Sequence, residues 1–215
     1  MKTNMHDAGI HHRRSIRVKG YDYAQDGAYF VTICAQSKQC LFGDIAKGEM
    51  KLNDVGRMVN DHWIGLKNRF SNIEIDEFIV MPNHFHGIIV IFSVGAGLVS
   101  ALPEHGIFPK SSKGVKQRNG STEANNTKMR ADTRPAPTNT VGDMMCAFKS
   151  LVANEYIKSV KSGKFPPFEK SVWQRNYYEH IIRDDNDLDR IREYIINNPL
   201  NWEIDELYSR IRRGE

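Results

Sequence analysis

The chain has 215 residues, 40% of them hydrophobic, and a formal net charge of +4 from 30 lysines and arginines against 26 aspartates and glutamates. This length suits one domain with extensions. No apolar run reaches 18 residues, and the first 20 residues are basic and polar, so we expect neither a membrane-spanning helix nor a secretory signal. The three cysteines, Cys34, Cys40 and Cys146, form neither a disulfide framework nor a zinc motif, which predicts a cytoplasmic protein with reduced thiols.

The positive charge is concentrated in two segments. Residues 1–20 hold five basic residues and one acidic residue, and residues 94–140 hold seven and three, so each segment carries +4 and the rest of the chain carries −4. Basic segments attached to a slightly acidic body are typical of polyanion-binding proteins. A solvated tail that binds nothing has the same composition, and charge alone does not separate the two interpretations.

The segment 94–140 also differs from the rest of the chain in composition. Of its 47 residues, 22 are Gly, Pro, Ser, Thr or Asn, and Phe108 is its single aromatic residue. Such a stretch buries too little apolar surface to offset the entropy of ordering it, which predicts disorder. We therefore expect one domain over 21–215 that is interrupted by this insertion and preceded by a basic arm over 1–20. The alternative is a linker between two domains of about 75 residues.

The residues before this segment predict strands, a hairpin and a helix. β-branched and aromatic residues indicate a strand over 29–35, and a glycine-containing turn between 40–45 and 49–53 indicates a hairpin. Asn53 or Asp54 can cap a helix whose apolar residues recur at helical spacing, namely Val55, Met58, Val59, Trp63 and Leu66. Two further strands are expected over 73–80 and 84–92.

The residues after the segment predict a helix, a strand and a second helix. Apolar residues at helical spacing indicate a helix over 141–160, and aromatic and branched residues indicate a strand over 172–183. The polar run 184–187 offers caps for a helix that Pro199 ends, and a last short helix is expected around Leu207 and Ile211. With the hairpin set aside, the order is β-α-β-β-α-β. This predicts a ferredoxin-like α+β fold with an antiparallel sheet, an added hairpin and a C-terminal helix.

The sharpest local feature is His84-Phe85-His86. Side chains alternate between the two faces of a strand, so both imidazoles point to the same face, about 6.6 Å apart at ~3.3 Å per residue. That separation lets them converge on one metal ion. Two histidines that are hydrogen-bonded within the core would give the same pattern, so the motif alone is weak evidence.

The C-terminal helix supplies two further candidates, Tyr194 and Asn198. They are four residues apart and therefore lie on one helix face, beside the apolar Ile191 and Ile195 that are expected to pack on the sheet. An amide oxygen suits a hard divalent ion such as Mg²⁺ or Mn²⁺. Each residue has an ordinary alternative role, Tyr194 as a core aromatic and Asn198 as a helix cap before Pro199.

Three segments together resemble a known family. These are Met81-Pro-Asn-His-Phe-His-Gly87, Trp173-Gln-Arg-Asn-Tyr-Tyr-Glu-His-Ile-Ile-Arg-Asp184 and Tyr194-Ile-Ile-Asn-Asn-Pro199. In order and content they resemble the REP-associated tyrosine transposases, a branch of the single-tyrosine transposases in the histidine-hydrophobe-histidine superfamily. The resemblance runs from about Tyr29 to Trp202 and leaves out 94–140.

The resemblance implies a role for each matching residue. His84 and His86 would hold the divalent metal, Mg²⁺ or Mn²⁺, with Asn198 as the third protein ligand, a position at which some relatives have Gln. Tyr194 would be the nucleophile, and its phenolate would form a covalent 5′-phosphotyrosine and release a 3′-hydroxyl. Tyr177 and Tyr178 are rival hydroxyls for which packing against the sheet is the preferred interpretation. His180 matches a family position without an assigned role.

The implied substrate is single-stranded DNA that contains a hairpin, as in REP elements. Phosphate contacts are expected from the basic arm, through Arg13, Arg14, Arg17 and Lys19, and from Lys149 and Arg175. The resemblance leaves open whether the chain acts as a monomer or as a homodimer, and which DNA sequence it recognises.

Three functions remain compatible with the sequence. The first is a metal-dependent DNA nicking and strand-transfer enzyme, the transposase interpretation. The second is a domesticated, inactive protein that binds single-stranded or hairpin DNA, against which the presence of His84, His86 and Tyr194 argues. The third is a histidine-based nucleotide hydrolase. It ranks last because no further histidine follows His86 before His105.

Overall fold

A computed structural model of the chain describes residues 20–92, 139–168, 170–205 and 207. The predicted basic arm, apart from Gly20, and the predicted insertion, apart from its last two residues, lie outside the described residues, and both remain predictions. None of the helices in the described ranges is long and apolar enough to cross a membrane.

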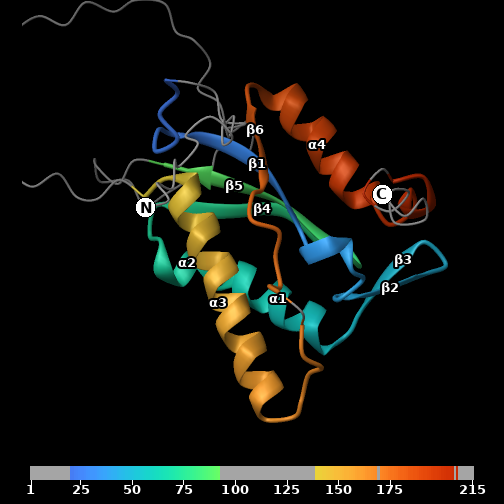
Figure 1. Cartoon of the computed structure of the whole chain (residues 1–215). Coiled ribbons are helices and arrows are strands. Elements are labelled where there is room, and N and C mark those ends of the chain that lie inside the picture. The colour runs from blue at the N-terminus through green and yellow to red at the C-terminus, as the bar shows by residue number, and fades with distance from the viewer. Residues whose placement is uncertain (1–19, 93–138, 169, 206, 208–215) are drawn as a thin grey trace, which may run out of the picture.

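The core of the fold is a four-stranded antiparallel sheet with the order β4–β5–β1–β6 (Figure 1). Its strands are β1 (Gly27–Cys34), β4 (Ile73–Val80), β5 (His84–Ile91) and β6 (Tyr178–Ile182). Strand β6 pairs with β1, so segments from both sides of residues 93–138 share one sheet. The added hairpin, β2 (Gly43–Ala46) and β3 (Glu49–Leu52), forms a separate two-stranded sheet. The predicted fold class is confirmed.

One face of the sheet carries helices α1 (Asp54–Ile64) and α3 (Val141–Lys161). The predicted cap Asn53 accepts a hydrogen bond from the amide of Gly56 and begins α1. Thr140 and Asp143 form a capping box at the start of α3. Both helices pack their apolar residues against the sheet side chains of this face in the larger hydrophobic core.

Helix α4 (Asp185–Asn197) lies on the opposite face, with the sheet between it and α3 (Figure 1). The Asp184 side chain caps its first turn by accepting from the amide of Asp187. Leu188, Ile191 and Ile195 pack in a smaller core against residues of β1, β5 and β6. Because this helix begins at β6 and crosses the sheet, its C-terminal end reaches the strand end where His84 lies (Figure 1).

The predicted strand over 172–183 is too long. Regular pairing begins at Tyr178, and before it only an isolated bridge joins Trp173 to Ala35. The reason is that a half-buried side chain competes for this backbone, because the Lys149 ammonium donates to the carbonyls of Gln174 and Arg175 at 2.7 and 2.9 Å. The predicted first helix is also interrupted, with a short α2 (Leu66–Arg69) after Gly65.

The expected short helix around Leu207 and Ile211 remains a prediction. A 3₁₀ turn, η2 (Trp202–Ile204), follows α4, Leu207 is helical, and Ile211 lies outside the described residues. Near the other end of the fold, a second 3₁₀ turn, η1 (Gln36–Lys38), follows β1.

Candidate active site

His84 and His86 lie on β5 and point to the α4 face of the sheet, as strand alternation predicts. Their ring centroids are 4.5 Å apart and both side chains are almost fully buried. The residues between and after them point to the other face. Phe85 packs on Trp63 there, and a Cβ at Gly87 would lie 2.5 Å from that indole, so glycine is required for this close approach. Within this motif, Phe85 and Gly87 pack against Trp63 on one face of the sheet, while both imidazoles point toward α4 on the other.

Asn83 sets the orientation and tautomer of His84. The Asn83 amide nitrogen donates to the carbonyl of Leu207 at 3.2 Å, which turns its oxygen toward the ring. His84 Nδ1 lies 2.6 Å from that oxygen and must donate, because an amide oxygen only accepts. The proton is thus held on Nδ1 and the lone pair of Nε2 is available, as in metal-binding histidines whose second nitrogen is fixed by a polar neighbour.

His86 bridges the sheet and the helix. Its Nδ1 lies 2.8 Å from the hydroxyl oxygen of Thr32 on β1, and its Nε2 lies 3.4 Å from the hydroxyl of Tyr194 on α4. Both contacts are satisfied when Nδ1–H donates to Thr32 and Nε2 accepts from Tyr194. Phe30 stacks on the His86 ring at 5.3 Å and meets the Tyr194 ring edge-on at 6.1 Å. The tyrosine is nevertheless 47% exposed, so its hydroxyl is within reach of a bound polymer.

Burial keeps both imidazoles neutral. It lowers the pKa of His84 to about 3 and lowers the pKa of His86 well below its usual value, and the charge of His84 acts on His86 in the same direction. Neutral imidazole is the form that binds a metal ion. The two rings therefore each carry an Nε2 lone pair at neutral pH and need no deprotonation to serve as ligands, although that of His86 faces the Tyr194 hydroxyl.

Asn198, directly after α4, completes a set of three donors. Its side chain is buried, and it lies close enough to His84 to oppose the effect of burial on the pKa of that ring. Yet Asn198 Oδ1 and His84 Nε2 are both buried without a hydrogen bond of normal geometry to any described residue. Orphaned buried polar atoms of this kind cost about 1–3 kcal/mol each, so a ligand between them is favoured.

These donors fit a divalent metal ion. Two imidazole nitrogens and an amide oxygen suit an ion such as Mn²⁺ or Mg²⁺. No group of three or more His, Cys, Asp or Glu side chains suited to a metal exists in the described part of the chain, so the set is neutral and contains no carboxylate. A neutral set binds a hard cation weakly, and phosphate oxygens of a substrate are the usual completion for such ions.

Side-chain hydrogen bonds join α4 to both edges of the sheet. At the β6 edge, His180 Nε2 lies 2.8 Å from the carboxylate of Asp187 in the first turn of the helix. At the β4 edge, Arg192 donates through two nitrogens to both carboxylate oxygens of Asp76. His180, which has no role in the sequence-based assignment, is thus a tie between strand and helix. These contacts hold the helix that carries Tyr194.

The Asp76–Arg192 pair gives a pH-dependent prediction. Burial alone would raise the pKa of Asp76, but hydrogen bonds from Arg192 and from the Glu77 amide lower it overall. A carboxyl with a depressed folded-state pKa stabilises the fold above its unfolded pKa and loses this effect as the pH falls through the folded value. We expect Asp76→Asn to lower the unfolding free energy by about 1–2 kcal/mol at pH 7, after discounting for the partial exposure of Arg192.

Urea denaturation at pH 7 and at successively lower pH measures this difference. The deficit of Asp76→Asn should shrink toward zero in acid, because the wild-type carboxyl then loses its charge as well. Asp189→Asn is the matched control. Asp189 pairs with the same Arg192 at 3.1 Å but is 74% exposed, so its loss should cost less than about 0.5 kcal/mol. Equal effects of the two substitutions on the unfolding free energy would contradict the stabilising role of the Asp76–Arg192 pair.

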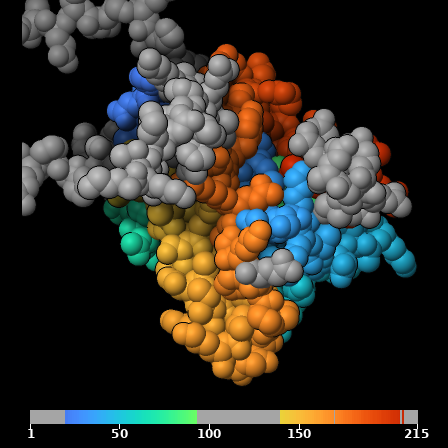
Figure 2. All heavy atoms as spheres, viewed as in Figure 1, coloured from blue at the N-terminus to red at the C-terminus, as the bar shows by residue number. Residues whose placement is uncertain are grey.

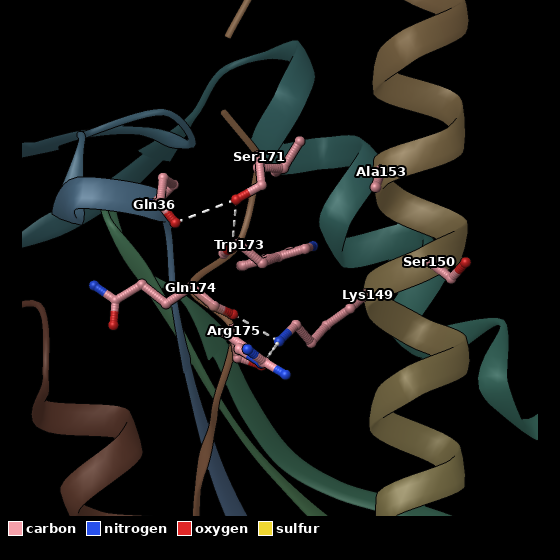
Figure 3. Close-up of a pocket in the computed structure, with 9 residues that line it drawn as sticks. Gln36, Lys149, Ser150, Ala153, Ser171, Trp173, Gln174 and Arg175 are labelled. Carbon is pink, nitrogen blue, oxygen red and sulfur yellow. Dashed lines mark hydrogen bonds between the residues drawn. The ribbon is translucent and has the colours of Figure 1, made fainter. Parts of the chain in front are cut away.

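Lys149 and Arg175 meet, but on the other face of the sheet from the histidines. They line a pocket of about 450 Å³ between α3 and residues 171–175, with Gln36 and Ser171 on its far wall (Figure 3). In the space-filling view α3 and this segment abut along one side of the molecule (Figure 2). Burial lowers the pKa of Lys149, and its ammonium is engaged by two backbone carbonyls. The arm residues Arg13, Arg14, Arg17 and Lys19 lie outside the described residues, so all six DNA contacts remain predictions.

The rival tyrosines have different surroundings. Tyr177 is partly buried against the larger core, as expected of a strand aromatic. Tyr178 is 54% exposed on the α4 face, paired through β1 with Thr32, so the expectation that it packs on the sheet is wrong. The reason is its position on an edge strand beyond the end of α4. The sequence argument also missed Thr32 and Asn83 as supports of the histidines, although a hydroxyl within the apolar strand 29–35 was a signal for the first.

Comparisons with known proteins place the chain among relatives. No protein-family model matches it. Over 208 residues the chain is 41% identical to an uncharacterised protein of Haemophilus influenzae, which covers 96% of this chain and 98% of that protein. A second Haemophilus influenzae protein, provisionally named a REP-associated tyrosine transposase, is 50% identical over 32 residues, or 15% of this chain and 18% of that one.

Two solved structures were also compared with the fold. One is a REP-associated tyrosine transposase bound to a REP hairpin, with a TM-score of 0.48 and 16% identity over 86% of this chain and 74% of that chain. The other, from Deinococcus radiodurans, is provisionally described as a transposase, with a TM-score of 0.41 and 14% identity over 84% and 95%. The chain therefore belongs to the family of the Haemophilus influenzae protein that it matches over 208 residues, and it also resembles REP-associated tyrosine transposases, in its three motifs and over the 32 matched residues.

Proposed function

We propose that the chain is a metal-dependent DNA nicking and strand-transfer enzyme, a tyrosine transposase that acts on single-stranded DNA. The observation that supports this most directly is the meeting of four side chains at one end of the sheet. His84 Nε2 and Asn198 Oδ1 are buried without a hydrogen bond of normal geometry to any described residue, and the Tyr194 hydroxyl contacts His86 while staying half-exposed.

His84, His86 and Asn198 would hold a divalent ion, Mg²⁺ or Mn²⁺. When bound, the ion would polarise a non-bridging oxygen of the scissile phosphate and orient that phosphate for attack. The residues of the chain would position the phosphate and the attacking tyrosine. Asn83 and Thr32 fix the two imidazoles, which limits the positions that a phosphate can take. The hydrogen bonds from α4 to β4 and β6 would hold Tyr194 at a fixed distance from the scissile phosphate.

The reaction balances without a nucleotide cofactor. The Tyr194 oxygen forms a bond to phosphorus while the bond from phosphorus to the 3′ oxygen breaks. The phenol releases its proton and the leaving 3′ oxygen takes one up, so there is no net change in protons. Because one phosphodiester replaces another, the 5′-phosphotyrosine retains the energy needed for a 3′-hydroxyl to reverse the step or to join another strand.

We propose hairpin-containing single-stranded DNA of the REP type as the substrate. The name of the second relative and the three motifs support this choice. The phosphate backbone would be held by the arm residues Arg13, Arg14, Arg17 and Lys19 and by Arg175, with Lys149 contributing through its remaining donor. These contacts are sequence-independent and should make affinity fall with rising salt.

The test is direct. The full chain is incubated with end-labelled single-stranded hairpin oligonucleotides and Mn²⁺, and the products are separated on denaturing gels. A labelled band at the mass of protein plus DNA, together with a shortened strand that ends in a 3′-hydroxyl, is the expected result. Salt-sensitive DNA binding without either product would contradict the proposed nicking and strand-transfer activity and favour the alternative of an inactive DNA-binding protein.

A further inference from the structure

A lysine near the histidines has no hydrogen-bond or ion-pair partner among the described residues. Lys38 lies in the η1 turn, which follows β1 directly at the strand end where Cys34 pairs with His84. Its side chain is half-buried, and its ammonium makes no hydrogen bond or ion pair with the described residues. A partly buried cation without an acceptor favours binding of an anion.

The loop that carries Lys38 is hydrogen-bonded to the residues directly before His84. The amide of Ala35 donates to the carbonyl of Asn83 at 2.9 Å, and the amide of Phe42 donates to the carbonyl of Pro82 at 3.0 Å. Both ends of the loop therefore rest on the two residues that precede His84. A third hydrogen bond, from the amide of Gln36 to the carbonyl of Val172 at 2.9 Å, joins this loop to the segment that precedes β6. The position of Lys38 is thus determined relative to the candidate metal ligands.

The backbone at this loop is strained. Ser37 and Lys38 have φ values of 55° and 53°, the left-handed region, which costs about 1–2 kcal/mol per residue for side chains other than glycine. A third such residue, Lys47, has a φ of 55° but lies with Gly48 in the two-residue turn of the β2–β3 hairpin, where positive φ is normal. No hairpin explains the strain at Ser37 and Lys38. Strain of this kind persists where surrounding contacts enforce it, and it is concentrated at functional sites.

The fold places Lys38 beside the candidate site. The η1 turn follows β1 directly, at the strand end where Cys34 pairs with His84. Because the loop is also hydrogen-bonded to Pro82 and Asn83, Lys38 lies next to the region where the scissile phosphate is proposed to bind.

We propose that Lys38 contacts a non-bridging oxygen of the scissile phosphate and stabilises the charge that develops on it during attack by Tyr194. The inference rests on the proposed function, because it assigns a further residue to the same site. Lys38 stays protonated throughout, forms no covalent bond and transfers no proton. Lysine suits this role as a compact point charge for phosphate. The positive charge of Lys38 complements a donor set that is itself neutral.

The experiment compares Lys38→Gly with Lys47→Gly. Both substitutions remove one lysine from a left-handed backbone position that glycine accepts, so both proteins should fold, as thermal unfolding would verify. The cleavage position is first mapped with the wild type, and single-turnover formation of the covalent product is then measured with Mn²⁺. Lys38→Gly should be about 100-fold slower, the usual loss for one stabilising donor, and Lys47→Gly should match the wild type. Lys38→Arg should recover most of the rate.

A second substrate separates charge stabilisation from a structural role. It carries a neutral methylphosphonate at the mapped position, which removes the charge that Lys38 would contact. On this substrate the difference between Lys38→Gly and the wild type should largely disappear. Equal rates of Lys38→Gly and Lys47→Gly on the natural substrate would overturn the role of Lys38 alone, whereas absence of any product from the wild type would overturn the proposed function with it.

Discussion

Replacing Tyr194 with phenylalanine should abolish the covalent protein–DNA product, lowering its rate of formation by at least about 1,000-fold, because the substitution removes the attacking oxygen. The ring would remain in place, since its edge contact with Phe30 and its contact with His86 at 5.2 Å involve no hydroxyl. DNA affinity should therefore stay close to that of the wild type. Denaturing gels report the product, and a filter-binding assay with the same oligonucleotide reports the affinity.

Tyr178→Phe is the matched control for this substitution. It removes the same atom from a tyrosine of similar exposure on the same face of the sheet. Its product should form at the wild-type rate. Loss of product in Tyr178→Phe together with normal product in Tyr194→Phe would transfer the role of nucleophile to the edge strand and would refute the assignment to α4.

The second large effect concerns the three proposed metal ligands, and its readout is thermal stability. A ligand that binds only the folded state stabilises it by about 2.7 kcal/mol at a concentration 100 times its Kd. We expect Mn²⁺ to raise the melting temperature of the wild type and the addition of hairpin DNA to enlarge the shift, because phosphate oxygens would complete the neutral donor set. His84→Ala should remove the shift.

Asn198→Asp should change stability in opposite directions with and without the ion. Without metal, a buried carboxylate replaces a neutral amide beside His84, so the melting temperature should fall. With Mn²⁺, the added negative charge strengthens the donor set, so the metal-induced rise should exceed that of the wild type. His62→Ala serves as the control, since His62 bonds Glu155 on the other face of the sheet and should leave the shift unchanged. A wild type insensitive to Mn²⁺, with and without DNA, would contradict the proposed ligands.

Most of the fold could be predicted from the sequence because its elements carry strong local signals. Helical spacing of apolar residues and the caps Asn53 and Asp184 determine the starts of α1 and α4. Strand alternation places His84 and His86 on one face. The error at the start of β6 has a tertiary cause, because the carbonyls of Gln174 and Arg175 are taken by Lys149 from a helix 25 residues earlier.

The candidate site, like the fold, could be predicted from the sequence only in part. The sequence by itself determined which side chains are candidates for the chemistry, since His84, His86, Tyr194 and Asn198 are proposed from two periodicities and from a family resemblance. The charge of +4 pointed only to segments that lie outside the described residues. It gave no reason to single out Lys38, because one lysine among 30 basic residues has no signal of its own.

Only the tertiary structure decided how these side chains are held and which of their atoms lack partners. The supports of the site come from contacts between distant segments, Thr32 on His86 and Asp76 on Arg192, and Lys38 stands on a loop anchored at Pro82 and Asn83. Such contacts depend on strand register and on the crossing of α4 over the sheet, which no local pattern encodes. Burial completes the site, because it keeps the imidazoles neutral and leaves two polar atoms in need of a ligand.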